Sequence, residues 1–115
     1  MSRSISLTLI GLLIIGCAAF DPKLAYRNAY FKAYPQTDPA MRADIEQGRI
    51  KTGMTREQVL AAWGDPSNRV QYDDGTEMWT YRWYESDAIS AFEKVTTLHF
   101  DRHGTLENIS IIKMN

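Results

Sequence analysis

Residues 53–66 read GMTREQVLAAWGDP, and this stretch marks both ends of one helix. Thr55 is a favourable N-cap residue, and Gln58 three positions later completes a capping box, in which each side chain satisfies a free backbone N–H group. Gly64 ends the helix, because glycine adopts the left-handed conformation cheaply and Asp65-Pro66 does not continue a helix. Three residues supply the apolar stripe: Val59, Leu60 and Trp63.

A second short helix is predicted just before this one. Asp38 is its N-cap, Pro39 occupies its first position, and Gly48 ends it. Met41 and Ile45 are four residues apart and share one face.

A further helix is predicted from Asp21-Pro22 to Pro35, with tyrosines at every fourth position on one face: Tyr26, Tyr30 and Tyr34. Tyrosine interspersed with lysine and arginine suits a membrane surface. The alternative is that this helix packs on its own domain or forms a semi-ordered spacer, as helices with one aromatic stripe often do.

After Pro66 the hydrophobic pattern alternates, which predicts strands over 68–72, 77–84, 95–100 and 105–112. Asp73-Asp74-Gly75 and residues 101–104 are turns. Three aromatic residues share one face of the second strand and are expected in the core: Trp79, Tyr81 and Trp83. Residues 85–94 form a polar connection with one helical turn around 88–92. The predicted fold is α+β, with two short helices on one face of an antiparallel meander and the other face free.

The N-terminus resembles a bacterial lipoprotein signal. Arg3 precedes an apolar run over residues 5–15, too short to cross a bilayer, and the run ends in Ile14-Ile15-Gly16-Cys17. This resembles a lipobox, in which the cysteine is acylated and the chain is cut just before it. The alternatives are a buried hairpin, a small membrane anchor, or an ordinary secretory signal ending at Gly16. We expect a signal peptide over 1–16, a lipidated juxtamembrane segment over 17–37, and one domain over 38–115.

Composition and motifs exclude several classes of function. The formal net charge is −1 with 44% hydrophobic residues, so the chain lacks the concentrated basic surface expected of a nucleic-acid-binding protein. The single cysteine excludes an intramolecular disulfide. No glycine-rich phosphate loop or nucleophile elbow is present, so we predict no enzyme, no catalytic residue, no cofactor and no small-molecule substrate. His99, Asp101 and His103 are too few and too incidental in spacing to predict a metal site.

Five segments together resemble the SmpA/OmlA family, also called BamE: IKTGMTREQV (50–59), WGDP (63–66), WTY (79–81), LHFD (98–101) and GTL (104–106). The resemblance spans residues 38–112. It implies two helices packed on a three-stranded antiparallel sheet, with residues 68–72 at most a short fourth strand. It also implies a periplasm-facing lipoprotein that supports the machinery inserting β-barrel proteins into the outer membrane. The chain departs from the family pattern at Trp63, where leucine is usual, and in the long segment 18–37, which leaves open a relative of different role.

Because the motif residues have structural explanations, function is expected on the free face of the sheet. Tyr72, Arg82 and Tyr84 are the candidate partner-binding residues, since exposed tyrosine and arginine are enriched at interface hot spots. The alternative for these three is a solvated strand face. The expected partners are the membrane, through acylated Cys17, and a protein of the barrel-assembly machinery. Ala18 after the cysteine favours the outer membrane. Rival functions are an inhibitor or adaptor of another envelope protein and a phospholipid-contacting structural lipoprotein.

Overall fold

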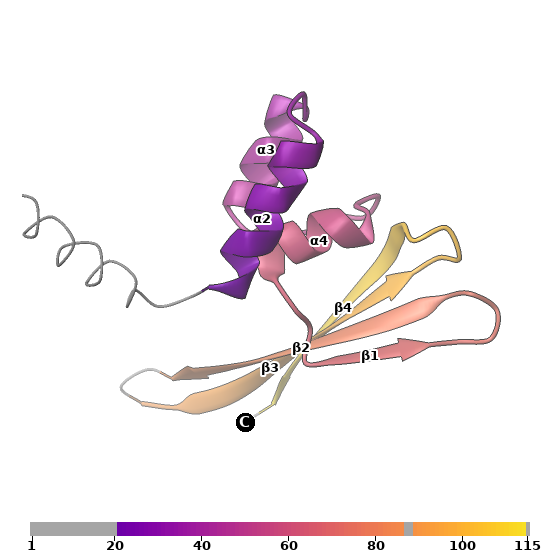
Figure 1. Cartoon of the computed structure of the whole chain (residues 1–115). Helices are drawn as coiled ribbons and strands as arrows, with labels where there is room; N and C mark the ends of the chain where they lie inside the picture. The colour runs from indigo at the N-terminus through magenta and orange to yellow at the C-terminus, as the bar shows by residue number, and fades with distance from the viewer. Residues whose placement is uncertain (1–20, 87–88, 115) are drawn as a thin grey trace, which may run out of the picture.

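The computed structural model describes residues 21–86 and 89–114, which form an α+β fold (Figure 1). The helices are α2 (Pro22–Ala33), α3 (Pro39–Glu46) and α4 (Arg56–Trp63), and the strands are β1 (Asn68–Gln71), β2 (Glu77–Ser86), β3 (Ala91–Phe100) and β4 (Leu106–Met114). The strands form one antiparallel sheet in the order β1-β2-β3-β4, and the helices lie on one side of it. This confirms the predicted fold class, with β1 as the short fourth strand.

The predicted helix ends are confirmed. In α4 the Thr55 N–H donates to Gln58 Oε1 at 2.9 Å, and the Gln58 N–H donates to Thr55 Oγ1 at 3.2 Å, which completes the capping box. The Asp38 carboxylate caps α3 by accepting from the Ala40 N–H at 3.1 Å. Gly64 follows α4 with φ 80°, and a Cβ there would meet Lys23 Cβ at 3.3 Å. Glycine is therefore needed both for the turn and for the approach of α2.

Helix α2 packs on α4, so the alternative in which the tyrosine-lined helix packs on its own domain is the one observed. Arg27 Nε donates to the Ala61 carbonyl at 3.0 Å, and Gln58 Nε2 donates to Tyr30 Oη at 2.8 Å. The other two tyrosines of the stripe donate to carboxylates, Tyr26 to Asp65 just after α4 at 2.6 Å and Tyr34 to Glu57 in the first turn of α4 at 3.3 Å. No helix in the described part of the chain is long and apolar enough to cross a membrane.

The core lies between α4 and the helix-facing side of the sheet. Trp79 is paired with Leu98, and Leu98 with Ile109, so three neighbouring strands place apolar side chains on the same face. The buried cluster consists of Met54, Val59, Trp79, Tyr81, Leu98, Phe100 and Leu106. Trp79 and Tyr81 are buried as predicted, whereas Trp83 is half-buried at the margin of this cluster.

The connection between β2 and β3 is shorter than predicted. Strand β2 continues to Ser86 and β3 begins at Ala91, with Ser86 paired with Ala91 and Glu85 with Phe92. The prediction of a helical turn around 88–92 is therefore wrong at Ala91 and Phe92, while Ala88 lies outside the described residues. Pairing between the two strands satisfies their backbone groups and overrides the weak local preference for a helical turn. Strand β4 likewise extends beyond Ile112 to Met114.

Candidate functional site

The side of the sheet opposite the helices carries the predicted partner-binding residues. Strand register aligns its side chains in rows across β2, β3 and β4, because alternate residues of a strand share a face. One half of this face is mostly polar, with rows formed by Thr80, Thr97 and Ser110 and by Met78, His99 and Asn108. The other half, toward the β2–β3 hairpin, carries apolar and aromatic side chains.

We call this second half the distal patch, defined by Arg82, Tyr84, Glu93, Val95, Ile112 and Met114. Its large side chains are exposed: Tyr84 by 81%, Ile112 by 56% and Met114 by 43%. In the described part of the chain no helix covers them, since α2, α3 and α4 all lie on the opposite side of the sheet (Figure 1). The distal patch is thus an exposed amphipathic surface formed by three paired strands.

An ion pair lies within the distal patch. Arg82 Nη1 is 2.9 Å from Glu93 Oε1, and the Arg82 backbone N–H donates to Ser67 Oγ at 3.3 Å. Because both side chains are partly exposed, the pair adds little to stability. The ion pair acts locally. It holds the Arg82 guanidinium beside the row formed by Tyr84, Glu93 and Met114, and the Glu93 carboxylate balances the charge of the guanidinium. The distal patch therefore presents apolar groups with no net charge.

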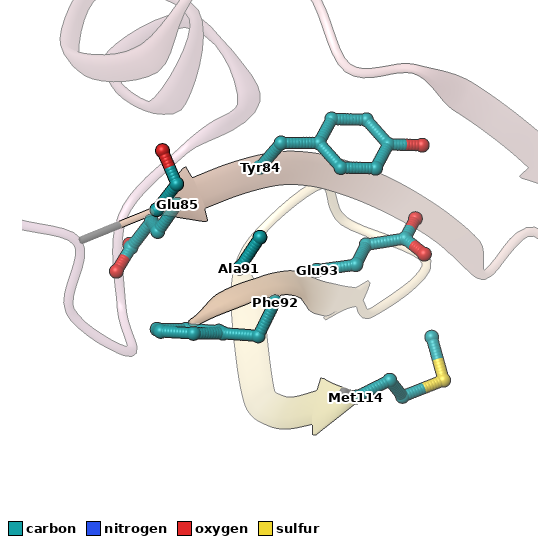
Figure 2. Close-up of a pocket in the computed structure, with 7 residues that line it drawn as sticks. Tyr84, Glu85, Ala91, Phe92, Glu93 and Met114 are labelled. Carbon is teal, nitrogen blue, oxygen red and sulfur yellow. The ribbon is translucent and has the colours of Figure 1, made fainter. Parts of the chain in front are cut away.

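A hollow of about 670 Å³ adjoins the distal patch at the hairpin end of the sheet (Figure 2). Tyr84, Glu93 and Met114 enter it from three different strands, while the Tyr84 and Phe92 rings point in opposite directions (Figure 2). It is lined by Tyr84, Glu85, Ser86, Ala91, Phe92, Glu93 and Met114. The hollow is wide and open, so it suits one or two side chains of a partner better than an enclosed small molecule.

Tyr72 lies away from the other two predicted residues. It follows β1, is 45% exposed, and its hydroxyl contacts Met78 Sδ at 3.9 Å. The Tyr72 N–H donates to the Thr76 carbonyl, and Thr76 is roughly 20 Å from Arg82 along an extended strand. The structure thus brings Arg82 and Tyr84 together and places Tyr72 at the opposite end of the same face.

Sequence reasoning missed four members of the distal patch: Glu93, Val95, Ile112 and Met114. Ile112 belongs to a predicted strand, and its alternation with Ile111 indicated that one of the two faces away from the core. Val95 was also in a predicted strand. Glu93 and Met114 fell outside the predicted strands, so no signal in the sequence joined them to Tyr84.

The departure from the family pattern at Trp63 has a structural explanation. The Trp63 ring meets Tyr81 edge-on at 5.1 Å and Trp83 at 4.9 Å, and its indole N–H donates to the Gly48 carbonyl at 2.8 Å. The Tyr81 hydroxyl donates to the Gly64 carbonyl at 2.7 Å, and burial raises the pKa of this phenol well above its usual value. These aromatics join α4 to β2 and shape the core margin.

The two histidines are not brought together with other ligands. His99 is half-buried on the uncovered face, whereas His103 is exposed in the turn after β3. Asp101 Oδ1 accepts the backbone N–H groups of Thr105 and His103 at 3.0 and 2.9 Å, which lowers the pKa of that carboxyl and uses it in the turn. Within residues 21–86 and 89–114, no three His, Cys, Asp or Glu side chains are placed to hold a metal ion.

The predicted lipidation site, Cys17, and the predicted signal peptide lie outside the described residues.

Comparison with known proteins adds one informative match. The family model of the outer membrane protein assembly factor BamE domain matches residues 43–110, more than half of the chain, from α3 into β4. A solved structure assigned to the osmotically inducible lipoprotein OsmE aligns with a TM-score of 0.46 at 15% identity, covering 67% of this chain and 87% of that one. No curated protein matches the chain. The matched residues include α4, strands β1 to β3 and most of the sequence motifs quoted above. The chain therefore belongs to the BamE domain family.

Proposed function

We propose that this protein is a lipid-anchored, periplasm-facing lipoprotein that supports outer membrane protein assembly by binding a protein partner, without catalysis of its own. The observation that carries the proposal is the BamE domain match over residues 43–110. The family's name refers to an assembly factor, and an assembly factor acts through contacts with other proteins. The distal patch is the surface we assign to that contact.

The chemistry of the distal patch suits a protein partner. Tyrosine, methionine and arginine are enriched at protein interfaces, and exposed apolar side chains gathered on one face mark such sites. The partner would cover Tyr84, Ile112 and Met114 and insert a side chain into the adjoining hollow. Tyr72 stays in the proposal as a separate contact at the other end of the face.

The lipid anchor at Cys17 would hold the start of α2 and the nearby end of β2 close to the membrane. An acylated Cys17 is five residues from Pro22, where α2 begins, and five residues span at most about 17 Å. Lys23, at the start of α2, lines the same surface hollow as Trp83 and Tyr84. The proposed binding surface therefore faces partners that lie close to the membrane, as barrel-assembly subunits do.

Crosslinked affinity capture from membranes tests the partner. We expect the full-length chain to recover barrel-assembly subunits, and Tyr84→Ala with Met114→Ala to reduce that recovery several-fold. Tyr72→Ala, tested separately, shows whether the second contact is used. Asn68→Ala is the matched control, because Asn68 is exposed on the polar half of the same face. Recovery of another envelope protein alone would favour the inhibitor or adaptor role, and recovery of lipid alone would contradict the proposal.

Replacement of Cys17 tests the anchor. Two or more acyl chains give stable membrane attachment, so Cys17→Ser should release the protein into the soluble fraction or leave an uncleaved precursor. Membrane fractionation and intact-mass measurement distinguish these results. A mature wild-type protein carrying an unmodified Cys17 would exclude lipidation.

A further inference from the structure

Strand β4 borders only β3, and the outer side of β4 is open over most of its length. Its start is covered, since the Leu106 N–H donates to the Met54 carbonyl at 2.8 Å and the Leu106 carbonyl accepts from the Gly53 N–H at 2.7 Å. A bulge then leaves Glu107 without a partner on β3, whereas every residue from 108 to 114 is paired with β3. We call residues 108–114 the open edge, because no backbone hydrogen bond to their outer side occurs within the described residues.

The open edge is long and apolar for an edge strand. Edge strands are usually kept short or interrupted, because their unpaired backbone groups bind other chains. The opposite edge of the sheet follows this rule, since β1 has only four residues, NRVQ, and is mostly polar. The open edge contains no proline, and it carries Ile111 and Ile112, each 56% exposed, on opposite faces of the sheet. It is therefore suited to accept a further strand.

Next to the open edge, the helix-facing side of the sheet carries a row formed by Trp83, Lys94 and Lys113. The two lysines are directly opposed, and like charges in this position destabilise a sheet. Their nearest aromatic contacts are distant, 5.8 Å from Lys94 Nζ to the Trp83 ring and 5.5 Å from Lys113 Nζ to the Phe92 ring. Within the described residues neither lysine forms an ion pair, and neither does Glu85 in the adjoining row. The row therefore lacks a carboxylate that pairs with its ammonium groups.

We propose that the open edge binds an extended segment of a protein partner as a fifth, antiparallel strand, with an acidic residue of that segment opposite Lys113. The backbone hydrogen bonds would supply affinity, and the acidic side chain would supply specificity. Its carboxylate would pair with Lys113 and reduce the repulsion between Lys113 and Lys94. The inference rests on the proposed function for the class of partner, a protein of the outer membrane assembly machinery, and adds how that partner is bound.

Two observations favour another protein as the occupant. Unpaired N–H and C=O groups along a strand are satisfied in register by a peptide backbone, which a lipid surface does not provide. A second copy of this chain would not supply the acidic residue from either edge. Its open edge contains one lysine and no acidic residue, and β1 contains one arginine and no acidic residue. Lys113 therefore disfavours pairing between copies and favours an acidic strand.

The open edge is continuous with the distal patch. The acidic side chain of the added strand would lie on the helix-facing side, beside Lys113, while alternate side chains of the same strand would lie beside Ile112 and Met114. Those two residues belong to the distal patch. One partner would thus pair with the backbone of β4 and also cover part of the distal patch.

Binding of a synthetic strand to the full-length chain in detergent micelles tests the site. The probe is a blocked seven-residue peptide of alternating threonine and valine in which glutamate replaces the first valine, so that antiparallel pairing with 108–114 places the glutamate opposite Lys113. Its NMR shift changes should lie along β4, and it should bind several-fold more tightly than the same peptide with lysine at that position. Lys113→Glu should reverse this preference, which also shows that the altered strand folds. Lys32→Glu is the matched control, because Lys32 is exposed on α2, and it should leave the preference unchanged.

Methylation of the peptide backbone tests strand pairing itself. In an antiparallel pair, alternate residues of a strand direct their N–H groups to the neighbouring strand. Two peptides are therefore made, each with one alternate set of amides methylated. One should lose binding and the other should keep it. The proposal is overturned if the glutamate peptide does not bind, if the shift changes lie away from β4, if the glutamate and lysine peptides bind equally, or if the two methylated peptides bind equally.

Crosslinked capture from membranes separates this inference from the proposed function. Lys113→Glu should reduce the recovery of barrel-assembly subunits several-fold, and the crosslinked segment of the subunit should contain an acidic residue. Unchanged recovery with Lys113→Glu would overturn the role of the open edge and leave the proposed function standing. Binding of the glutamate peptide without recovery of any assembly subunit would contradict the proposed function and leave the open edge as a strand-binding site.

Discussion

Trp79 shows how much one side chain contributes to this small core. It is fully buried on β2, with its ring 4.6 Å from that of Phe100 and the Arg69 guanidinium 4.5 Å from its centroid. Its indole N–H donates to the Glu77 carboxylate. Arg82, three residues further along the same strand, faces the other side of the sheet and remains exposed.

These two positions predict a large difference in stability. Trp79→Ala should lower the free energy of unfolding by roughly 3–5 kcal/mol, the range for removal of a buried large aromatic. Arg82→Ala should change it by less than about 1 kcal/mol, because an exposed ion pair contributes little. Urea unfolding of both variants in a soluble form beginning at Ala18 measures the difference, and equal midpoints would contradict the assignment of the two faces.

At the scale of elements, α2 is attached to α4 by polar contacts at both ends of α4, and those at its C-terminal end include a cation. Arg27 donates to the carbonyls of Ala61 and Ala62 at 3.0 and 3.4 Å. These are last-turn carbonyls of α4, which a cation both hydrogen-bonds and stabilises through the helix dipole. None of the residues of α2 is buried, so its attachment depends on contacts such as this one more than on apolar burial.

Removal of the Arg27 side chain should therefore loosen α2. We expect Arg27→Ala to reduce stability by about 1.5–3 kcal/mol, the range for hydrogen bonds to a charged group. Hydrogen exchange should increase in α2 more than in α3. Lys32→Ala is the matched control, because Lys32 is exposed in the last turn of the same helix. Equal exchange in the two variants would show that Arg27 does not hold α2 in place.

At the scale of the whole molecule, three carboxylates in separate regions make stability depend on pH. Lys51 and Arg49 beside Asp44 lower the pKa of that carboxyl, with Nζ and Nε at 2.9 and 2.8 Å from its oxygens. Hydrogen bonds from the Thr76 side chain and backbone lower the pKa of Asp74, and backbone N–H groups lower that of Asp101. Each folded-state pKa lies below its unfolded value, so the unfolded chain binds more protons in acid.

The protein should consequently lose stability as the pH falls below about 4, since the contribution of a lowered carboxyl pKa is present above the unfolded pKa. Urea midpoints measured between pH 7 and pH 3 test this. Asp44→Asn should lower the midpoint at pH 7 and reduce the fall in acid. Asp73→Asn is the control, because the Asp73 side chain forms no ion pair or hydrogen bond within the described residues. Identical pH profiles for the two variants would contradict the role of Asp44.

Features that depend on neighbouring residues could be predicted from the amino-acid sequence alone. Helix ends at Asp38, Thr55 and Gly64 were predictable because caps act through backbone groups two or three residues away. The strand alternation separated Trp79 and Tyr81 from Arg82, since successive side chains of a strand point to opposite faces. The family resemblance followed from the same local motifs, and the BamE domain match confirms it.

Contacts between residues that are distant in the chain became known from the folded structure. Pairing of β2 with β3 turned a predicted loop into strand, and it brought Glu93 to Arg82 and Tyr84. The register of β4 then added Met114 to the distal patch, while the length of β2 kept Tyr72 at the far end. These contacts join residues that are far apart in the chain, and their geometry depends on strand register, which local preferences do not specify.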